Sequence, residues 1–195
     1  MRLCWVINVT TLPDLRGHCR DSTAHAEAYS NSRDLVVTLF EQYHTAIFAY
    51  VYRLVDDREW AHDLTQDTFL KLFRARNRLP RVKNQRAWIY RIATNLAFNA
   101  LKRQRRFVWL PWRSADVARL TAPDSIQDSD RCLAVERALA QLPPHYRAPL
   151  LLHSHYGFSV QEVAQALNIS KGAVKTRLYR AREMFRRAYN GEDIA

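Results

Sequence analysis

Residues Ser159–Glu183 have the sequence SVQEVAQALNISKGAVKTRLYRARE, which predicts two short helices joined by a tight turn. Ser159 and Glu162, three positions apart, form a capping box, so the first helix begins here. Four apolar residues at helical spacing give this helix one buried face: Val160, Val163, Ala164 and Leu167. The joint follows at Asn168, and Ser170 can cap the second helix.

The second helix of the pair combines an apolar back with a basic front. Its buried side contains Val174, Leu178, Ala181 and Phe185. An apolar back with long donors on the opposite arc is typical of a recognition helix in the major groove of DNA. We predict that five residues contact duplex DNA: Lys171, Lys175, Thr176, Tyr179 and Arg180. The simpler alternative is a helical hairpin with a solvated basic face.

The charge of the whole chain also favours an anionic partner. Its 195 residues include 30 Lys and Arg against 19 Asp and Glu, a formal net charge of +11. Thirteen basic residues and no acid fall between Lys71 and Arg113, which indicates nucleic acid or an anionic membrane surface. Only 4 glycines, together with apolar residues at helical spacing, predict an all-α protein.

Changes in composition divide the chain into four parts. Residues 1–30 are expected to be a poorly ordered N-terminal extension, and residues 31–113 a first helical domain. Residues 114–130 contain Pro123 and four aspartates, which predicts a flexible linker. Residues 131–190 are expected to form a second small helical domain.

The first domain opens with two apolar stripes, each of which predicts one buried helix face. The first contains Leu35, Val36, Leu39, Phe40, Tyr43, Ile47, Val51 and Leu54. The second contains Trp60, Ala61, Leu64, Phe69, Leu72 and Phe73. A polar loop at residues 76–84 and a third helix at residues 85–106 follow.

The third helix has two different faces. Its buried stripe contains Ile89, Ile92, Ala93, Leu96 and Ala100. Its other face contains Arg91, Thr94, Asn95, Phe98, Lys102 and Arg105, with Trp88 and Asn99 at the border. Cations that follow a phosphate backbone, amides that bind base edges and a ring that stacks on a base suit single-stranded DNA.

We predict that seven residues here contact single-stranded DNA: Arg86, Trp88, Arg91, Asn95, Phe98, Asn99 and Lys102. The loop Leu79–Arg86 would close over a base flipped out of the duplex. A stacked base contributes about 1–3 kcal/mol, so such a protein can hold an opened duplex without ATP. The competing interpretation makes Trp88 a core anchor.

An acidic run, Asp56, Asp57, Glu59, Asp63 and Asp67, stands directly before the basic region. Acids beside a DNA-binding surface are poorly placed to contact DNA, whereas a protein partner with a basic face would fit them. The alternative is a solvated helix surface with acids near its N-terminus.

The motifs of enzymes and metal proteins are missing from the sequence. It has no GxxxxGK[ST] loop and no HExxH motif, and His153 and His155 would point in different directions on a helix. We expect no catalytic residue, metal or cofactor. Cys4, Cys19 and Cys132 have no zinc-like spacing, which favours reduced thiols in a cytoplasmic protein. The apolar stretch LCWVINV is too short for a membrane span.

Three segments, taken together, resemble the extracytoplasmic-function (ECF, group IV) class of bacterial sigma factors, in the sigma-70 family. DLTQDTFLKLF (Asp63–Phe73) resembles region 2.2 of that family. AWIYRIATNLAFNALKRQRR (Ala87–Arg106) resembles regions 2.3 and 2.4, and Leu142–Glu183 resembles region 4. The resemblance covers about four-fifths of the chain, in the family's order. It implies a non-catalytic subunit that binds core RNA polymerase, directs it to promoters and assists promoter melting.

The resemblance also implies roles for particular residues. Asp63, Gln66, Asp67 and Phe69 would face the clamp coiled coil of the largest polymerase subunit, and region 4 would meet the β flap. The predicted single-strand residues would meet the −10 element and the predicted duplex residues the −35 element. An anti-sigma factor is a further expected partner.

A helix-turn-helix regulator that works without polymerase is the alternative function. It would explain Ser159–Arg187 but would give no role to the acidic and basic pattern of the first domain.

Overall fold

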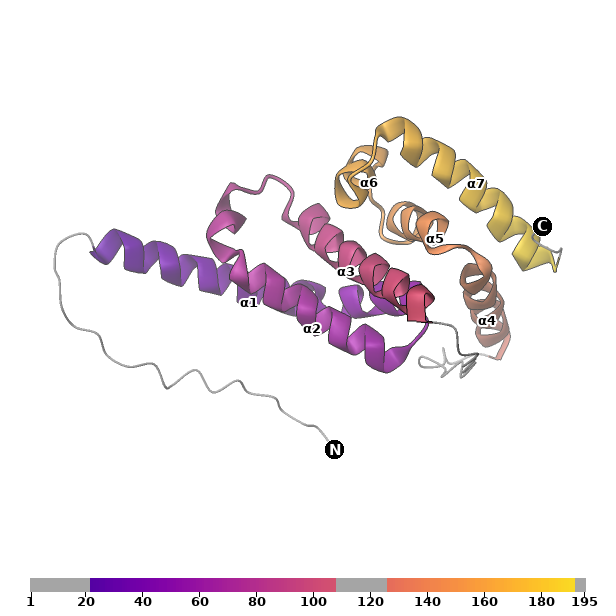
Figure 1. The fold of residues 1–195 in the computed structure, drawn as a ribbon, viewed down its shortest axis with the longest axis horizontal. Helices are drawn as coiled ribbons and strands as arrows, with labels where there is room; N and C mark the ends of the chain where they lie inside the picture. Colours follow the sequence, from indigo (N-terminus) through magenta and orange to yellow (C-terminus); the bar gives the residue numbers. More distant parts are fainter. Residues whose placement is uncertain (1–21, 108–125, 192–195) are drawn as a thin grey trace.

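The computed structural model describes the backbone of residues 22–107 and 126–191, and the side chains of residues 34–104 and 132–191. Every regular element in these ranges is helical, as the sequence predicts (Figure 1). The N-terminal half contains α1 (Ser22–Val55), α2 (Arg58–Arg74), the 3₁₀ helix η1 (Arg76–Arg81) and α3 (Gln85–Phe107). The C-terminal half contains α4 (Ile126–Gln141), α5 (Pro144–Leu150), the π-helical turn η2 (Leu151–His155), α6 (Val160–Leu167) and α7 (Lys171–Asn190).

Short polar residues set where the helices of the N-terminal half begin. Asp57 caps α2, because its carboxylate accepts a hydrogen bond of 2.8 Å from the Trp60 amide. The Asn84 side chain accepts one of 2.9 Å from the Ala87 amide and so caps α3. The residues predicted as a polar loop form η1, which is anchored by the fully buried Leu79.

Two helices begin earlier than the sequence analysis predicts. Helix α1 starts at Ser22, inside the predicted extension, and α4 starts at Ile126, inside the predicted linker. Most polar residues have similar helix propensities, so polar composition alone did not exclude helix there. The rest of the predicted extension and of the predicted linker lies outside the described residues.

The C-terminal half forms the helix-turn-helix that its sequence predicts. The capping box is present in both directions: the Glu162 amide donates to the Ser159 hydroxyl (3.2 Å), and the Ser159 amide donates to the Glu162 carboxylate (2.9 Å). Asn168 takes the left-handed conformation (φ 54°) that ends α6, and the Ser170 hydroxyl caps α7. On the inner side of α7, Val174, Leu178 and Ala181 are buried as predicted, and Phe185 is half-buried against the core.

The two halves pack directly against one another and share one hydrophobic core, with α6 lying against α3 (Figure 1). Tyr50 and Tyr90 of the N-terminal half are almost fully buried, as is Phe158 of the C-terminal half. The Tyr90 and Phe158 rings meet edge to face with centroids 5.0 Å apart. Both predicted helical domains are therefore present, and the structure adds an extensive contact between them.

Candidate nucleic-acid interface

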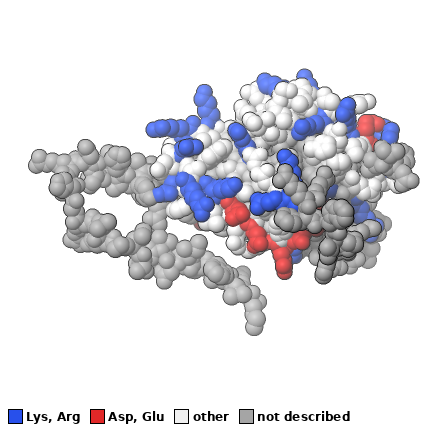
Figure 2. Space-filling model, viewed as in Figure 1, with Lys and Arg blue, Asp and Glu red and all other residues white. Residues whose placement is uncertain are grey.

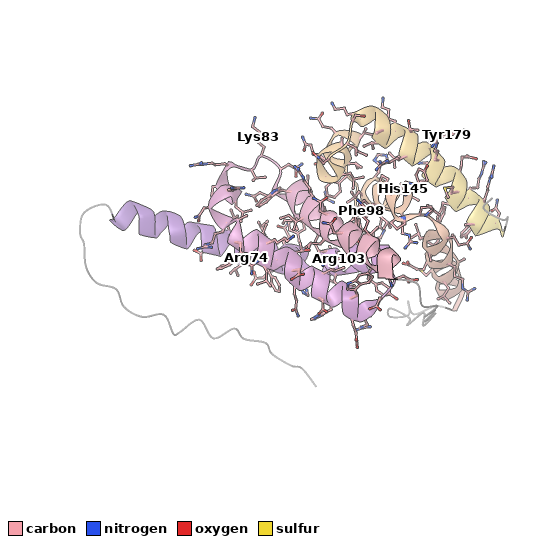
Figure 3. The ribbon with its side chains drawn as sticks, viewed as in Figure 1. Arg74, Lys83, Phe98, Arg103, His145 and Tyr179 are labelled. Atoms are coloured by element: carbon pink, nitrogen blue, oxygen red, sulfur yellow. The ribbon has the colours of Figure 1, made fainter. Side chains whose placement is uncertain are left out.

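The five residues predicted to contact duplex DNA lie together on the exposed arc of α7. All five side chains are exposed, and Tyr179 is 70% exposed and points away from the molecule (Figure 3). The Arg180 guanidinium donates a 3.3 Å hydrogen bond to the Tyr146 hydroxyl, and the Lys171 ammonium donates one of 3.0 Å to the Gln161 side chain. Both bonds involve exposed groups, so DNA can replace them at low cost.

Most of the face predicted for single-stranded DNA is also accessible on α3. Arg91, Asn95, Asn99 and Lys102 are exposed. Trp88 and Phe98 are half-buried and pack against the shared core, so each ring has one face held by protein. The structure thus brings cations, amides and aromatic edges together along one side of α3. The side chain of Arg105 lies outside the described residues.

Thr94 was wrongly expected on this exposed face. It is 1% exposed, and its hydroxyl lies 2.8 Å from the Tyr50 hydroxyl and donates a 2.7 Å bond to the Tyr90 carbonyl. The reason is that α3 packs against helices on more than one side, which narrows its exposed arc. Burial raises the pKa of Tyr50, so this buried pair is a neutral structural contact.

Arg86 is held by the C-terminal half rather than left free. Its guanidinium donates to the Tyr156 carbonyl, and its Cζ lies 4.1 Å from the centroid of the Phe158 ring. Its neighbour Asn84 donates a 2.9 Å bond to the Glu162 carboxylate. These contacts join residues far apart in the chain, so no sequence pattern could have indicated them.

The region before α3 carries a further basic surface. Arg78, Arg81 and Lys83 are exposed around η1, and Arg74 is exposed at the end of α2. Figure 2 shows basic side chains gathered at this end of the molecule and over α7, and Figure 3 places Lys83 pointing outward. Leu79, which begins the loop predicted to close over a flipped base, is fully buried and therefore serves as its anchor.

Helix α2 presents the predicted polymerase-binding residues in two different ways. Asp63, Gln66 and Asp67 are exposed, and Figure 2 shows a strip of acidic side chains bordered by basic ones. Phe69 is only 7% exposed and packs edge to face on Phe40, with ring centroids 4.9 Å apart. The side chain of Phe69 therefore packs inside the protein, behind this surface, and supports it through its contact with Phe40.

Helices α1 and α2 also expose an apolar patch that the sequence pattern did not indicate. It consists of Val37, Phe40, Leu70 and Phe73, which are 42–56% exposed. Phe40 and Phe73 were assigned to buried stripes, but helical spacing cannot tell a core face from a face that awaits a partner. A patch of this kind is typical of a protein-binding surface.

The described residues contain no group of three or more His, Cys, Asp or Glu side chains arranged to hold a metal ion. His153 instead has its Nδ1 atom 2.7 Å from the Phe158 carbonyl. In the same parts of the chain, none of the helices is long and apolar enough to cross a membrane.

Comparison with known proteins identifies the family. Residues 39–107 match the model of sigma-70 region 2, and residues 132–185 match the model of sigma-70 region 4. RNA polymerase sigma factor CarQ of Myxococcus xanthus is 30% identical over 156 residues, which cover 80% of this chain and 89% of CarQ. The chain therefore belongs to the sigma-70 family of RNA polymerase sigma factors, in its ECF group, whose members direct polymerase to promoters.

Other relatives agree with this assignment. ECF sigma factor SigW of Bacillus subtilis is 26% identical over 166 residues, 80% of this chain and 89% of SigW. ECF sigma factor SigE of Mycolicibacterium smegmatis is 32% identical over 154 residues, which cover 76% of this chain but only 59% of SigE. Because both halves match the family, a regulator that works without polymerase has no support beyond the helix-turn-helix.

Solved structures share the fold. Sigma factor RpoE of Bartonella quintana, solved in complex with the anti-sigma factor NepR, superposes with a TM-score of 0.63 at 22% identity. That match covers 80% of this chain and 97% of RpoE. CnrH, solved in complex with the cytosolic domain of CnrY, gives a TM-score of 0.61 at 22% identity, covering 86% of this chain and 96% of CnrH.

Proposed function

We propose that this chain binds core RNA polymerase through α2, contacts the −35 element as duplex through α7, and holds the melted −10 element on α3. The observation that carries the proposal is the exposure of three surfaces of different chemistry on three different helices, α2, α7 and α3. One surface is acidic and apolar, one is basic on a helix-turn-helix, and one combines cations with amides and aromatic rings.

The −35 contacts are assigned to Lys171, Lys175, Thr176, Tyr179 and Arg180. These side chains are exposed on the helix that follows the turn, where a recognition helix presents its donors to base edges and phosphates. The opposite face of α7, with Val174, Leu178 and Ala181, is buried in the core, so the helix backbone needs little further ordering on binding.

The −10 contacts are assigned to α3 and the basic segment before it. Arg91 and Lys102 would follow phosphates, Asn95 and Asn99 would bind base edges, and the half-buried rings of Trp88 and Phe98 would support flipped bases. Arg86 is also included among the proposed −10 contacts, because it lies at the start of α3.

The polymerase contact is assigned to α2, with acids at its centre and the apolar patch beside them. Asp63, Gln66 and Asp67 are exposed, and Phe40 and Phe73 offer apolar area. A basic partner surface such as the clamp coiled coil of the largest subunit fits this combination. The β flap is the proposed partner of the C-terminal half.

We also propose that the chain is a non-catalytic initiation subunit of the cytoplasm and that an anti-sigma factor controls it. Support for an anti-sigma partner comes from a solved structure of similar fold, RpoE of Bartonella quintana, which was solved in complex with the anti-sigma factor NepR.

The test is transcription in a purified system. Core polymerase, the chain and a library of genomic fragments should give RNA from discrete start sites, whereas core polymerase alone should not. Transcription that starts without site preference would refute the function.

Asp67→Arg separates the polymerase surface from the DNA surfaces. Asp67 is exposed, so the variant should keep its melting temperature. It should assemble with core polymerase about tenfold less tightly, because it places a cation against a basic partner. Lys175→Asp, a charge reversal on α7, is the matched control and should leave assembly unchanged. Equal assembly by Asp67→Arg and the unaltered chain would remove α2 from the interface.

A further inference from the structure

Two donors on the exposed arc of α7 are hydrogen-bonded to side chains of other helices. The Nη1 group of Arg180 donates to the Tyr146 hydroxyl of α5 at 3.3 Å, and the Lys171 ammonium donates to Gln161 of α6 at 3.0 Å. The two acceptors differ in how firmly they are held. Gln161 is exposed, whereas Tyr146 is half-buried and packs against the core. A packed ring has few alternative rotamers, so its hydroxyl is a fixed acceptor, and an exposed amide is not.

The corner between α4 and α5 holds the backbone that carries Tyr146. The pair Pro143–Pro144 separates the two helices, and each proline ring restricts its own φ angle. The buried Arg147, next to Tyr146, closes this corner from inside. Its guanidinium donates to the Ala140 carbonyl at 2.5 Å and to the Leu142 carbonyl at 2.9 Å, which are groups at the end of α4. Tyr146 therefore stands on a turn with little conformational freedom.

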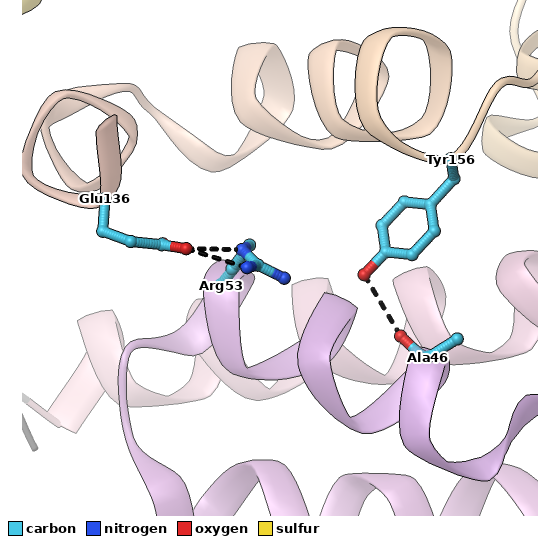
Figure 4. A network of polar contacts seen from close by, with 4 residues as sticks. All are labelled: Ala46, Arg53, Glu136 and Tyr156. Atoms are coloured by element: carbon cyan, nitrogen blue, oxygen red, sulfur yellow. Dashed lines mark hydrogen bonds and ion pairs between the residues drawn. The ribbon is translucent and has the colours of Figure 1, made fainter. Parts of the chain in front are cut away.

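The same corner is joined to α1. Arg147 also donates a 2.7 Å hydrogen bond to the Arg53 carbonyl. The Arg53 guanidinium in turn forms an ion pair of 2.8 Å with Glu136 of α4 (Figure 4). Helix α5 packs directly against α7, so a fixed corner places the Tyr146 hydroxyl at a constant position beneath the basic arc (Figure 1).

The bond to Tyr146 leaves most of the Arg180 guanidinium available to DNA. A guanidinium carries several N–H donors in a planar fork, and this bond uses Nη1 alone. Arg180 can therefore keep the bond while another edge of the fork contacts a base. An arginine side chain loses much rotamer freedom when it binds a base in a bidentate manner. A bond that orients the group beforehand lowers that cost.

We propose that Tyr146 is a positioning residue for promoter recognition, whose hydroxyl holds Arg180 so that the rest of the guanidinium faces the base edges of the −35 duplex. The inference rests on the proposed function of α7. Because the hydroxyl acts through Arg180, it influences base preference at the base pair that Arg180 contacts and at no other. Tyr146 and Arg180 are 34 positions apart, so no periodic pattern in the sequence connects them.

Tyr146→Phe is the main test, because it removes the hydroxyl and keeps the packed ring. The assay is transcription by the full chain with core polymerase, from a promoter recovered in the genomic-fragment experiment. Its upstream duplex element is varied one base pair at a time. Arg180→Ala identifies the base pair at which preference is lost. At that base pair Tyr146→Phe should lower the preference for the best base about threefold, since a single exposed hydrogen bond makes a modest net contribution.

Two controls separate positioning from other roles. Tyr146→Phe added to Arg180→Ala should cause no further loss, because the hydroxyl then has no guanidinium to hold. Gln161→Ala removes the bond to Lys171 from a mobile acceptor, so it should change base preference less than about twofold at every position. The melting temperature of Tyr146→Phe should stay within about 2 °C of the unaltered chain. A purely structural role for the hydroxyl would instead lower initiation equally on all promoter variants.

An unchanged base preference in Tyr146→Phe would overturn the positioning role. So would a loss at a base pair that Arg180→Ala does not affect, an equal loss in the Arg180→Ala background, or no base-specific loss in Arg180→Ala itself. A sharper preference in Tyr146→Phe would overturn it too, because the hydroxyl would then withhold Arg180 from DNA. Any of these results with site-specific initiation by the unaltered chain removes the positioning role and keeps the proposed function. Initiation without site preference by the unaltered chain removes both.

Discussion

Helices α3 and α7 are both proposed to bind DNA, yet the fold treats them differently. Helix α7 packs through one side, so its opposite arc is exposed along Lys171, Lys175 and Tyr179. Helix α3 contacts α1 and α2 on one side and α6 on another, so Thr94 is buried and Arg86 is held. A helix at the edge of a fold can show its whole polar face, whereas a helix between neighbours shows only part of it.

Two tyrosines give the strongest test of this difference. Tyr90 on α3 is 1% exposed and Tyr179 on α7 is 70% exposed. Tyr90→Ala should lower the free energy of unfolding by about 3–5 kcal/mol, because it leaves a cavity at the centre of the shared core. Tyr179→Ala should change it by less than about 0.5 kcal/mol. Urea unfolding followed by circular dichroism measures both, and similar losses would contradict the contrast between the helices.

Arg180→Ala tests the exposed helix for function. Loss of this donor should weaken promoter-specific initiation by about 2 kcal/mol, roughly thirtyfold, because guanine contacts of this type are strong and specific. Assembly with core polymerase should not change. Arg186→Ala is the control, since that guanidinium is already paired with Glu183 at 2.7 Å. Start-site mapping with both variants is the measurement. An unaltered promoter profile for Arg180→Ala would show that Arg180 does not contact the −35 element.

Phe98→Ala tests the partly covered helix. The ring is half-buried, so its loss should remove about 1 kcal/mol of stacking and shorten the lifetime of the open complex about fivefold. Affinity for the closed complex should change less. Decay of the open complex after addition of heparin gives the lifetime. If the open-complex lifetime and the closed-complex affinity fall equally, Phe98 acts through packing. Leu101→Ala, which removes another half-buried side chain of α3, is the packing control and is expected to lower both equally.

The smallest predicted effect concerns Glu162, which links α6 to α3. Hydrogen bonds from Ser159, and a weaker one from Asn84, hold the pKa of this carboxyl below its ordinary value. A lowered folded-state pKa contributes stability that is present above about pH 4.5 and is lost as the pH falls through the folded value. Because the group is largely solvated, the contribution should be under about 1 kcal/mol. Glu162→Gln should flatten the profile of the unfolding free energy below about pH 4.5, measured by urea unfolding at a series of pH values.

The sequence predicted the helix-turn-helix with its caps, its buried side and its exposed arc. Ser159, Glu162 and Ser170 act through hydrogen bonds within three positions of themselves, and a helix that packs through one side follows its apolar spacing. The all-α class and the family could be predicted for the same reason. Both depend on local sequence patterns that occur in the right order along the chain.

Only the tertiary structure decided which polar residues remain available. Thr94 is buried by Tyr50, 44 positions away, and Arg86 is covered by Phe158, 72 positions away. Phe40 and Phe73, expected in the core, are exposed instead. Burial is set by what lies opposite a helix face, and contacts between residues so far apart leave no periodic signal in the chain.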